Sequence, residues 1–285
     1  MIDLHCHMLP GIDDGAADLE ASLAMARIAA GDGIQVTACT PHVMAGVYDN
    51  TGPDIRRRVA EFQRVLDREG IPLKVVPGCD AHMDPDLSTG LQTGRAPSLN
   101  GSRYFLFEPP HHVAPPRLEH AVFDLMTAGY QPLLTHPERL TWIEGHYETM
   151  RRLSRAGVWM QITAGSVTGR FGRRPRYWAE RMADEGLVHV LATDAHDPKR
   201  RPPLLAEARD ALAERLGEDE ATHMVVTRPR GVIENVEVAS LPPALAERPE
   251  ARAAARSAAE PKTSFMAGFL ANIGGGARRQ RGSYR

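Results

Sequence analysis

The sequence predicts an α/β protein built on parallel strands. Seven short runs rich in apolar and β-branched residues alternate with segments that have helical apolar spacing. Several of the helical segments end at glycine, which adopts the left-handed conformation common after a helix. Strands that alternate regularly with helices form parallel sheets, because a crossover helix joins each strand to the next. This pattern alone allows either a closed barrel or an open doubly wound sheet.

The expected elements are spread evenly along most of the chain. The expected strands are Met1–His7, Ile34–Thr40, Leu73–Cys79, Arg103–Glu108, Gln131–His136, Val158–Thr163 and Leu187–Thr193. The expected helices are Leu19–Ala30, Ile55–Glu69, Arg117–Ala128, Tyr147–Ala156, Arg176–Glu185 and Leu204–Leu216. The glycines expected just after helices are Gly31, Gly70, Gly129, Gly157 and Gly186.

The composition changes after about Pro242. The chain has 285 residues, a length that a single α/β barrel domain commonly uses. Residues 243–262 are rich in Ala, Arg, Glu and Pro, a composition that does not bury a core. We therefore expect one domain over residues 1–242 and a disordered tail over residues 243–285.

Charge and cysteine content narrow the class of protein. The net charge of −2 provides no general attraction to nucleic acid or to an anionic membrane. No segment reaches the roughly 18 apolar residues of a membrane span, and the first residues lack the features of a signal peptide. Three cysteines are too few for a disulfide framework and fit a reducing compartment. We expect a cytoplasmic protein.

Cysteine-based phosphatase chemistry does not fit the sequence. That chemistry requires a nucleophilic cysteine followed by an arginine six positions later. The residues six positions after Cys6, Cys39 and Cys79 are Ile, Ala and Pro. A nucleotide-binding phosphate loop with the pattern GxxxxGK[ST] is also missing from the sequence.

Side chains that can bind metals follow nearly every predicted strand. In parallel barrels the carboxyl ends of the strands form the face that carries the active site. His5 and His7 are two residues apart, so on a strand they point to the same side. Asp194 and His196 repeat this spacing near the other end of the chain. The expected metal ligands from this pattern are His5, His7, His42, Asp80, Glu108, His136, Asp194 and His196.

Each of these residues has a simpler explanation when it is considered alone. His42 fits a turn or core histidine, and Asp194 fits a helix cap. Glu108 follows four apolar strand residues, where an unpaired charge would be costly. The shared placement at strand ends favours a metal site. Three further histidines lie close in sequence to these positions: His82, His111 and His112.

The assembled motifs resemble the polymerase and histidinol phosphatase (PHP) superfamily. Within it, the chain is most similar to the bacterial tyrosine-protein phosphatases of capsular and exopolysaccharide loci. The resemblance covers roughly residues 1–236, and the His-Pro-Glu-Arg segment and the long first motif are its specific parts. The segments that carry it are residues 2–7, 9–15, 40–42, 135–139, 165–172 and 192–196.

This resemblance implies a distorted (β/α)7 TIM-like barrel of the PHP type with two or three divalent metal ions. Manganese is the expected metal, with iron or zinc as alternatives. The first metal would be bound by His5, His7 and Asp194, and the second by Glu108 and His136. The third would be bound by Asp14, His42 and His196, and position 80 would bridge the first two.

The resemblance also implies the catalytic residues and the substrate. Arg139 would bind the substrate phosphate, and His136 and Asp194 are the other expected catalytic residues. The expected reaction is hydrolysis of phosphotyrosine in proteins, with a bacterial tyrosine autokinase as partner. Position 80 is a departure, because Asp80 stands where the resemblance implies Glu. A shorter side chain makes it harder to bridge two metals.

Other functions remain open at this point. One is a small-molecule phosphatase such as histidinol phosphatase. Another is a metal-binding scaffold whose catalysis is impaired by the change at position 80. A nuclease fits less well, because the chain is slightly acidic. An arginine cluster after the sixth predicted strand fits attraction of an acidic phosphopeptide or an ordinary solvated loop: Arg170, Arg173, Arg174 and Arg176.

Overall fold

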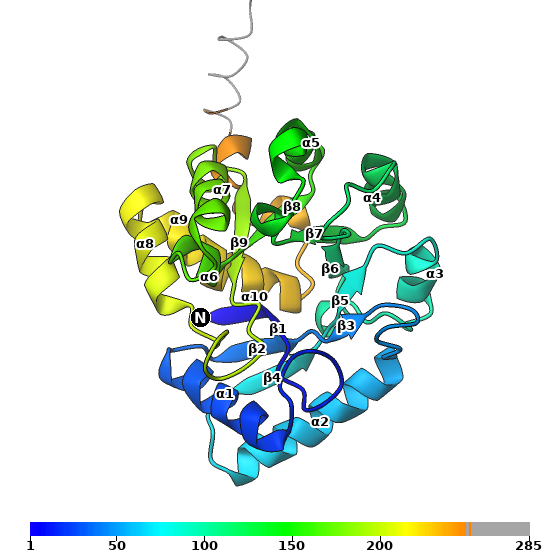
Figure 1. Cartoon of the computed structure of the whole chain (residues 1–285), viewed down its shortest axis with the longest axis vertical. Coiled ribbons are helices and arrows are strands. Elements are labelled where there is room, and N and C mark those ends of the chain that lie inside the picture. Colours follow the sequence, from blue (N-terminus) through cyan, green and yellow to red (C-terminus); the bar gives the residue numbers. More distant parts are fainter. Residues whose placement is uncertain (249–250, 252–285) are drawn as a thin grey trace, which may run out of the picture. The chain divides into compact units, whose positions relative to one another are not determined.

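A computed structural model describes residues 1–248 and residue 251, with the helices arranged around the strands (Figure 1). All pairings between the named strands are parallel. One sheet has the order β1 (Ile2–Cys6), β2 (Val36–Cys39), β4 (Lys74–Pro77). The other has the order β3 (His42–Val43), β5 (Asp80–His82), β6 (Tyr104–Glu108), β7 (Gln131–Thr135), β8 (Trp159–Thr163), β9 (Val188–Ala192).

Two of the expected strands are each followed by a short strand that lies beyond their expected ends at Thr40 and Cys79. β2 continues into β3, and β4 continues into β5, so both sheets share these two stretches of chain. The interruptions fall at Pro41 and after Pro77. Proline cannot donate a ladder hydrogen bond, which explains why the pairing stops there. Beyond the interruption the pairing resumes, with His42 opposite Asp80.

The first and last strands meet where both end. An isolated parallel bridge joins Cys6 to Ala195, and the His7 amide donates to the Ala195 carbonyl at 2.8 Å. The Asp194 amide donates to the His5 carbonyl at 2.8 Å. The expected parallel α/β fold is therefore confirmed. A single closed barrel sheet is not confirmed, because the strand hydrogen bonds divide into two sheets.

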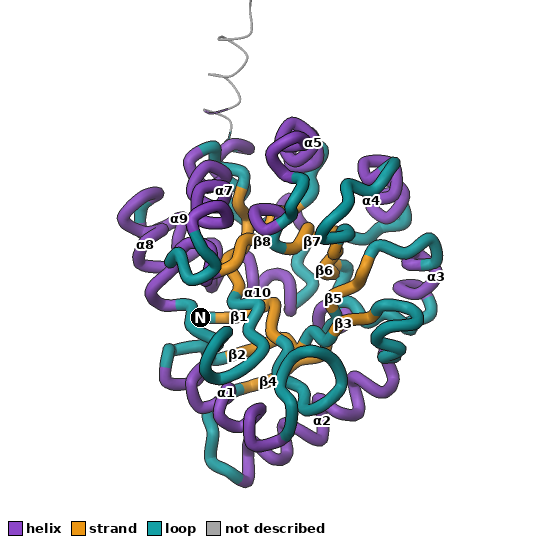
Figure 2. Tube along the Cα trace, viewed as in Figure 1, coloured by secondary structure: helices purple, strands orange, loops and turns teal. Residues whose placement is uncertain are grey.

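Helices cover the outside of the strands (Figure 2). The six expected helices are found as α1 (Leu19–Gly31), α2 (Gly52–Arg68), α4 (Leu118–Thr127), α5 (Ile143–Arg155), α7 (Arg173–Asp184) and α8 (Ala206–Leu216). The sequence pattern missed the shorter ones: α3 (Leu87–Gln92), α6 (Ala164–Val167), α9 (Glu218–Thr222), a π-helix (His223–Thr227) and α10 (Arg228–Ile233). Within the described residues, each helix is too short or too polar to cross a bilayer.

Glycine ends most of the expected helices in the predicted way. Gly70, Gly129, Gly157 and Gly186 all have positive φ. Gly31 differs, because it is the last residue of α1 and the positive φ falls on Gly33.

The core explains why polar side chains collect at the strand ends. Along β6, Phe105 and Phe107 belong to the larger apolar cluster, which includes residues of α4. Tyr104 and Leu106 belong to a second cluster of strand residues. Side chains alternate along a strand, so Glu108 lies on the side of Tyr104 and Leu106. On this side of β6, Tyr104 and Leu106 are buried among apolar residues and Glu108 comes last. The Glu108 carboxylate therefore lies at the carboxyl end of the strand.

A buried arginine holds the end of the described chain against the strands. Arg228 is fully buried and pairs with Glu220 at 2.8 Å. Its guanidinium also donates to the carbonyls of His189 at 3.0 Å and of Pro242 and Pro243 at 2.8 Å. Packing continues to Glu247, and most of the predicted tail lies outside the described residues.

We expect Arg228→Met to lower the free energy of unfolding by about 3–5 kcal/mol, because Glu220 would lose the guanidinium that lies against it. Urea unfolding measures the change. Arg64→Met is the matched control, since Arg64 is exposed on α2 and its loss should change stability by less than about 0.5 kcal/mol. Equal stability of the two variants would contradict this account of the buried pair.

Candidate metal centre

All nine side chains expected to bind metal come together at the carboxyl ends of the strands. They form four overlapping groups, and in each group the possible ligand atoms lie within 4.8 Å of one another. The groups are His7, Asp14, His42 and His196; His5, His7 and Asp80; His5, His136 and Asp194; and His42, Asp80 and Glu108.

Asp80 lies in the middle of this cluster. One of its carboxylate oxygens is 3.4 Å from His5 Nε2, 3.7 Å from His42 Nδ1 and 4.0 Å from His136 Nε2. The residue is fully buried, and among the described residues neither oxygen has a hydrogen-bond partner. Burial, and secondly the Glu108 carboxylate, raises the pKa of Asp80. A buried carboxylate is costly unless a positive charge lies beside it, either a protonated imidazole or a bound cation.

The two carboxylate oxygens of Asp194 contact different groups of side chains. One oxygen faces His5 Nε2 at 3.4 Å and His7 Nε2 at 3.5 Å. The other accepts from Arg201 Nη2 at 2.7 Å and contacts Arg139 Nη1. Burial opposes ionisation, but His5, Arg201 and Arg139 together hold the pKa of Asp194 well below its usual range. Asp194 is therefore a carboxylate that can accept a cation.

The histidines differ in charge because their neighbours differ. Burial alone would lower the pKa of His5, but Asp194 and Asp80 outweigh it and raise the value to about 9. Burial and the Arg139 charge lower the pKa of His136 to about 3. A neutral imidazole is the form that binds a metal, so His136 is already in that form at neutral pH.

Polar partners orient the first two histidines. His7 Nδ1 donates to Asp13 Oδ2 at 2.8 Å, and His5 Nδ1 lies 2.9 Å from Gln161 Oε1. Both rings therefore turn Nε2 toward the cluster, where the two Nε2 atoms are 3.2 Å apart. Partners of this kind fix the ring orientation of metal-binding histidines. Strand periodicity does not indicate these roles, although Asp13 lies beside Asp14 in the first motif.

The loop between β1 and α1 is packed tightly against the strand ends. A Cβ on Gly15 would lie 2.2 Å from the His7 carbonyl oxygen and 2.5 Å from the His7 Cβ. Asn50 Nδ2 donates to the carbonyls of Ile12 at 3.0 Å and of His42 at 2.9 Å. These contacts bring Asp14 to 3.5 Å from His42.

Two of the site residues have left-handed backbone conformations. The φ angle is 34° at His136 and 49° at Asp194. Residues other than glycine rarely adopt this region, and strain of this kind costs about 1–3 kcal/mol. Such residues concentrate at functional sites, where the surrounding contacts hold them in place.

Two arginines stand beside Asp194 on one aromatic ring. The Arg139 guanidinium lies 4.9 Å from the centre of the Phe171 ring, and that of Arg201 lies 5.6 Å away. A Cβ on Gly165 would lie 2.8 Å from this ring, so glycine gives Phe171 its place. Arg139 was expected from the family resemblance, whereas Arg201 was not, because it lies in a loop without regular spacing.

Buried hydrogen bonds hold the turn that carries Arg139 in place. Glu138 is buried and accepts from the Thr163 amide at 2.9 Å and from Ser166 Oγ at 2.8 Å. These bonds fix the Pro137–Arg139 turn to the end of β8.

Three further aromatic side chains border the cluster. His82 Nδ1 lies 3.5 Å from a Glu108 oxygen, and the His111 ring centre lies 6.2 Å from that of His136. Tyr48 stacks on His42 with ring centres 5.5 Å apart.

These features define a parallel α/β protein with a rim of clustered imidazoles and carboxylates beside two guanidiniums. The chain belongs to the CpsB/CapC family of capsular polysaccharide synthesis, which it matches over residues 1–234.

The chain is similar to tyrosine-protein phosphatases over nearly their whole length. It is 35% identical over 243 residues to YwqE from Bacillus subtilis, covering 85% of this chain and 95% of that protein. It is 28% identical over 238 residues to CpsB from Streptococcus pneumoniae, covering 82% and 98%. A solved structure from work on these two proteins, described as unique metal-dependent tyrosine phosphatases, matches with a TM-score of 0.80 at 34% identity, covering 84% of this chain and 96% of that one.

We expect Gly15→Ala to destabilise the protein by about 1–3 kcal/mol, because the new methyl group would overlap the His7 backbone. The matched control is Gly31→Ala in α1, where a Cβ would meet no atom within 4 Å. That change should be neutral or stabilise by up to about 1 kcal/mol. Thermal unfolding of both variants measures the difference, and a Gly15→Ala variant as stable as the Gly31→Ala variant would rule out the close packing.

Proposed function

We propose that this chain is a metal-dependent phosphoric monoester hydrolase that acts on phosphotyrosine in proteins. The observation that carries the proposal is the buried Asp80 carboxylate, which lies among clustered imidazoles and has no hydrogen-bond partner in the part of the chain that the structure describes. The family relationship supports the reaction, because the similar proteins are tyrosine-protein phosphatases.

The nine clustered side chains are the proposed metal ligands, and their contacts fit three sets. The first set is His5, His7 and Asp194, with pairwise separations of 3.2 to 3.5 Å between their ligand atoms. The second is Glu108 and His136, separated by 3.7 Å. The third is Asp14, His42 and His196, where Asp14 lies 3.5 and 3.4 Å from the two histidines.

Asp80 is the proposed bridging ligand despite its short side chain. Its oxygen lies within 4.0 Å of imidazoles from the first, second and third sets. These distances support the interpretation that Asp80 can bind metal together with all three sets. They favour an active enzyme over a metal-binding scaffold with impaired catalysis. Imidazole and carboxylate ligands suit Mn, and also Fe or Zn, and we propose Mn.

Cysteine chemistry has no support at the site. Cys6, Cys39 and Cys79 are buried and have no disulfide partner. Burial raises the pKa of each thiol, so none forms the thiolate that a nucleophile requires.

The protein's own residues would bind and orient the phosphate. Bound divalent metals supply a water of lowered pKa and neutralise charge on phosphoryl oxygens. Arg139 is the proposed phosphate ligand, with His136 and Asp194 as the catalytic residues that hold the metals. Arg201 joins Arg139 in this proposal, because its Nε is buried without a hydrogen-bond partner in the described part of the chain. A phosphoryl oxygen would satisfy this donor.

The proposed partner is a bacterial tyrosine autokinase, in the cytoplasm. The family's link to capsular polysaccharide synthesis and the buried free cysteines support this placement.

We expect metal-stripped protein to regain phosphatase activity on a phosphotyrosine peptide when Mn is restored, and less with Zn or Mg. His136→Ala should lose both metal and activity, because a proposed ligand is removed. Arg139→Ala should keep its metal and lose roughly 10²–10³-fold in kcat, because it removes a charge that stabilises the transition state. Metal analysis and kinetics on the same samples separate the two effects.

The same assay includes histidinol phosphate as a competing substrate and Arg64→Ala as a surface control. A higher kcat/KM for histidinol phosphate than for the phosphotyrosine peptide would show that histidinol phosphate is the preferred substrate. Undiminished activity in both site variants would overturn the site assignment.

We expect Asp13→Ala to weaken metal binding by roughly 10–100-fold, because His7 would lose the acceptor that orients its ring. Asp13→Asn keeps an oxygen acceptor at this position and should lose less. Competition against a metal-binding dye measures both affinities. Wild-type affinity in the alanine variant would show that Asp13 does not position His7.

A further inference from the structure

The loop that follows β6 separates the candidate metal centre from a neighbouring pocket. On one side of this loop, residues 109–117, the His111 ring lies 6.2 Å from that of His136. The loop is fixed in place, because Trp142 Nε1 donates to the Pro110 carbonyl at 2.9 Å and the Thr141 amide donates to the His111 carbonyl at 3.1 Å. The metal centre and the pocket therefore border the same loop, which these hydrogen bonds hold against the start of α5.

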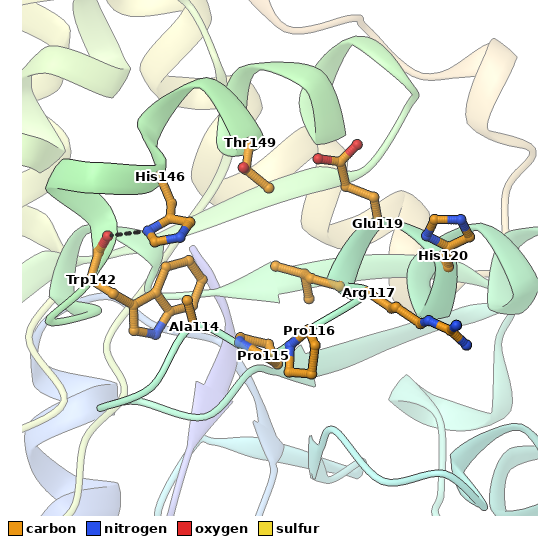
Figure 3. A pocket seen from close by; sticks show the side chains of 10 residues that line it. Ala114, Pro115, Pro116, Arg117, Glu119, His120, Trp142, His146 and Thr149 are labelled. Atoms are coloured by element: carbon orange, nitrogen blue, oxygen red, sulfur yellow. Dashed lines mark hydrogen bonds between the residues drawn. The ribbon is translucent and has the colours of Figure 1, made fainter.

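On the other side of the loop lies a pocket of about 400 Å³ between the first turns of α4 and α5. Figure 3 shows Trp142 and His146 at one end of it, Glu119 and His120 at the other, and Pro115 along its edge. The loops that form it follow β6 and β7, which end in Glu108 and just before His136. Loops after parallel strands lie on the active-site face, so the loops that line the pocket belong to the same face as the metal centre.

The charges around this pocket favour an anion. Arg117 has no ion-pair partner in the described part of the chain, and it takes a left-handed backbone conformation with φ 59°. The one carboxylate in the lining, Glu119, is already paired with Arg152 at 2.5 Å. His146 donates from Nδ1 to the Trp142 carbonyl, which leaves its other nitrogen available. The lining thus combines the positive charge of Arg117 at one end with the Trp142 indole at the other, and two proline rings lie between them (Figure 3).

The arginines that follow β8 are less available for the same task. Arg170 pairs with Glu207 and Arg176 with Glu180, at 2.8 and 2.7 Å. Arg174 donates to the carbonyls of Leu140 and Thr141. Three of the four arginines noted in the sequence therefore already have partners, whereas within the described residues Arg117 has no ion-pair partner.

We propose that this pocket binds an anionic side chain of the same polypeptide that carries the phosphotyrosine, either a carboxylate or a second phosphate. The proposal rests on the proposed phosphatase function, because it assigns the segment that flanks the hydrolysed residue. Arg117 attracts the charge, and the faces of Trp142 and Pro115 pack against the neighbouring chain. Aromatic rings suit this role, because they offer a large contact area with little rotamer freedom to lose.

The test compares peptides that differ only in the residues flanking one phosphotyrosine. One has glutamates, one has a second phosphotyrosine, and one has glutamines; a small aryl phosphate serves as a substrate without flanks. Arg117→Glu should raise KM for the two anionic peptides by roughly tenfold and change kcat little. The glutamine peptide and the aryl phosphate should stay within about twofold. Higher salt should reduce the difference between the peptides.

Arg64→Glu on α2 is the matched control, because it makes the same charge change at an exposed position away from the pocket. It should leave KM and kcat unchanged for all four substrates. If only one anionic peptide responds to Arg117→Glu, that peptide identifies the source of the charge. Equal loss on every substrate, or no loss on the anionic peptides, would overturn the pocket assignment. A wild-type protein that hydrolyses the aryl phosphate but no phosphotyrosine peptide would instead refute the proposed function.

Discussion

The site depends on the energetic cost of a buried carboxylate that has no hydrogen-bond partner within the described residues. Asp80 is fully buried, and imidazole nitrogens of His5 and His42 lie 3.4 and 3.7 Å from one of its carboxylate oxygens. A carboxylate in this position needs a positive charge beside it. The raised pKa of His5 makes its imidazolium one source of that charge, and a cation bound among the imidazoles would be another. The same cation would use the lone pairs of the imidazoles. Metal binding and stability are coupled in such a site.

The break in two strands is what brings Asp80 to this position. The pairing between β2 and β4 ends at Cys39 and Pro77, and it resumes between β3 and β5 with His42 opposite Asp80. Gly78 lies in the break, and a Cβ there would be 2.9 Å from Leu99. The missing side chain lets the backbone approach its neighbours closely. Close approach of the backbone is a direct way for the shorter Asp to reach the centre of the cluster.

The sequence was sufficient for those site residues whose positions follow from strand periodicity. His5 and His7 share a side because side chains alternate along β1 and its end. Asp194 and His196 also come together, but they lie beyond the end of β9, where Asp194 has a left-handed backbone, so strand alternation does not explain their position. The role of Gln161 could not be predicted, because it depends on a contact between segments 156 positions apart in the chain. Asp13 is only six residues from His7, but its role depends on how the loop after β1 folds back. The expected strand Ile34–Thr40 is shorter in the structure, where β2 covers Val36–Cys39, and the two-residue strand β3 after Pro41 is too short to show a periodicity. The short helices were missed for a related reason, since four to six residues are too few to show helical periodicity.

Asp194 links metal binding to phosphate binding within the proposed function. Its two oxygens face opposite ways, one toward His5 and the other toward the guanidiniums of Arg139 and Arg201. A carboxylate held by two arginines cannot turn freely, so the arginines fix the geometry of a proposed metal ligand. Arg201 reaches Asp194 through Nη2, which leaves its buried Nε for another acceptor. A phosphoryl oxygen beside Arg201 would therefore add to the contacts that hold Asp194 rather than replace them, and metal and phosphate would favour the same arrangement of these side chains.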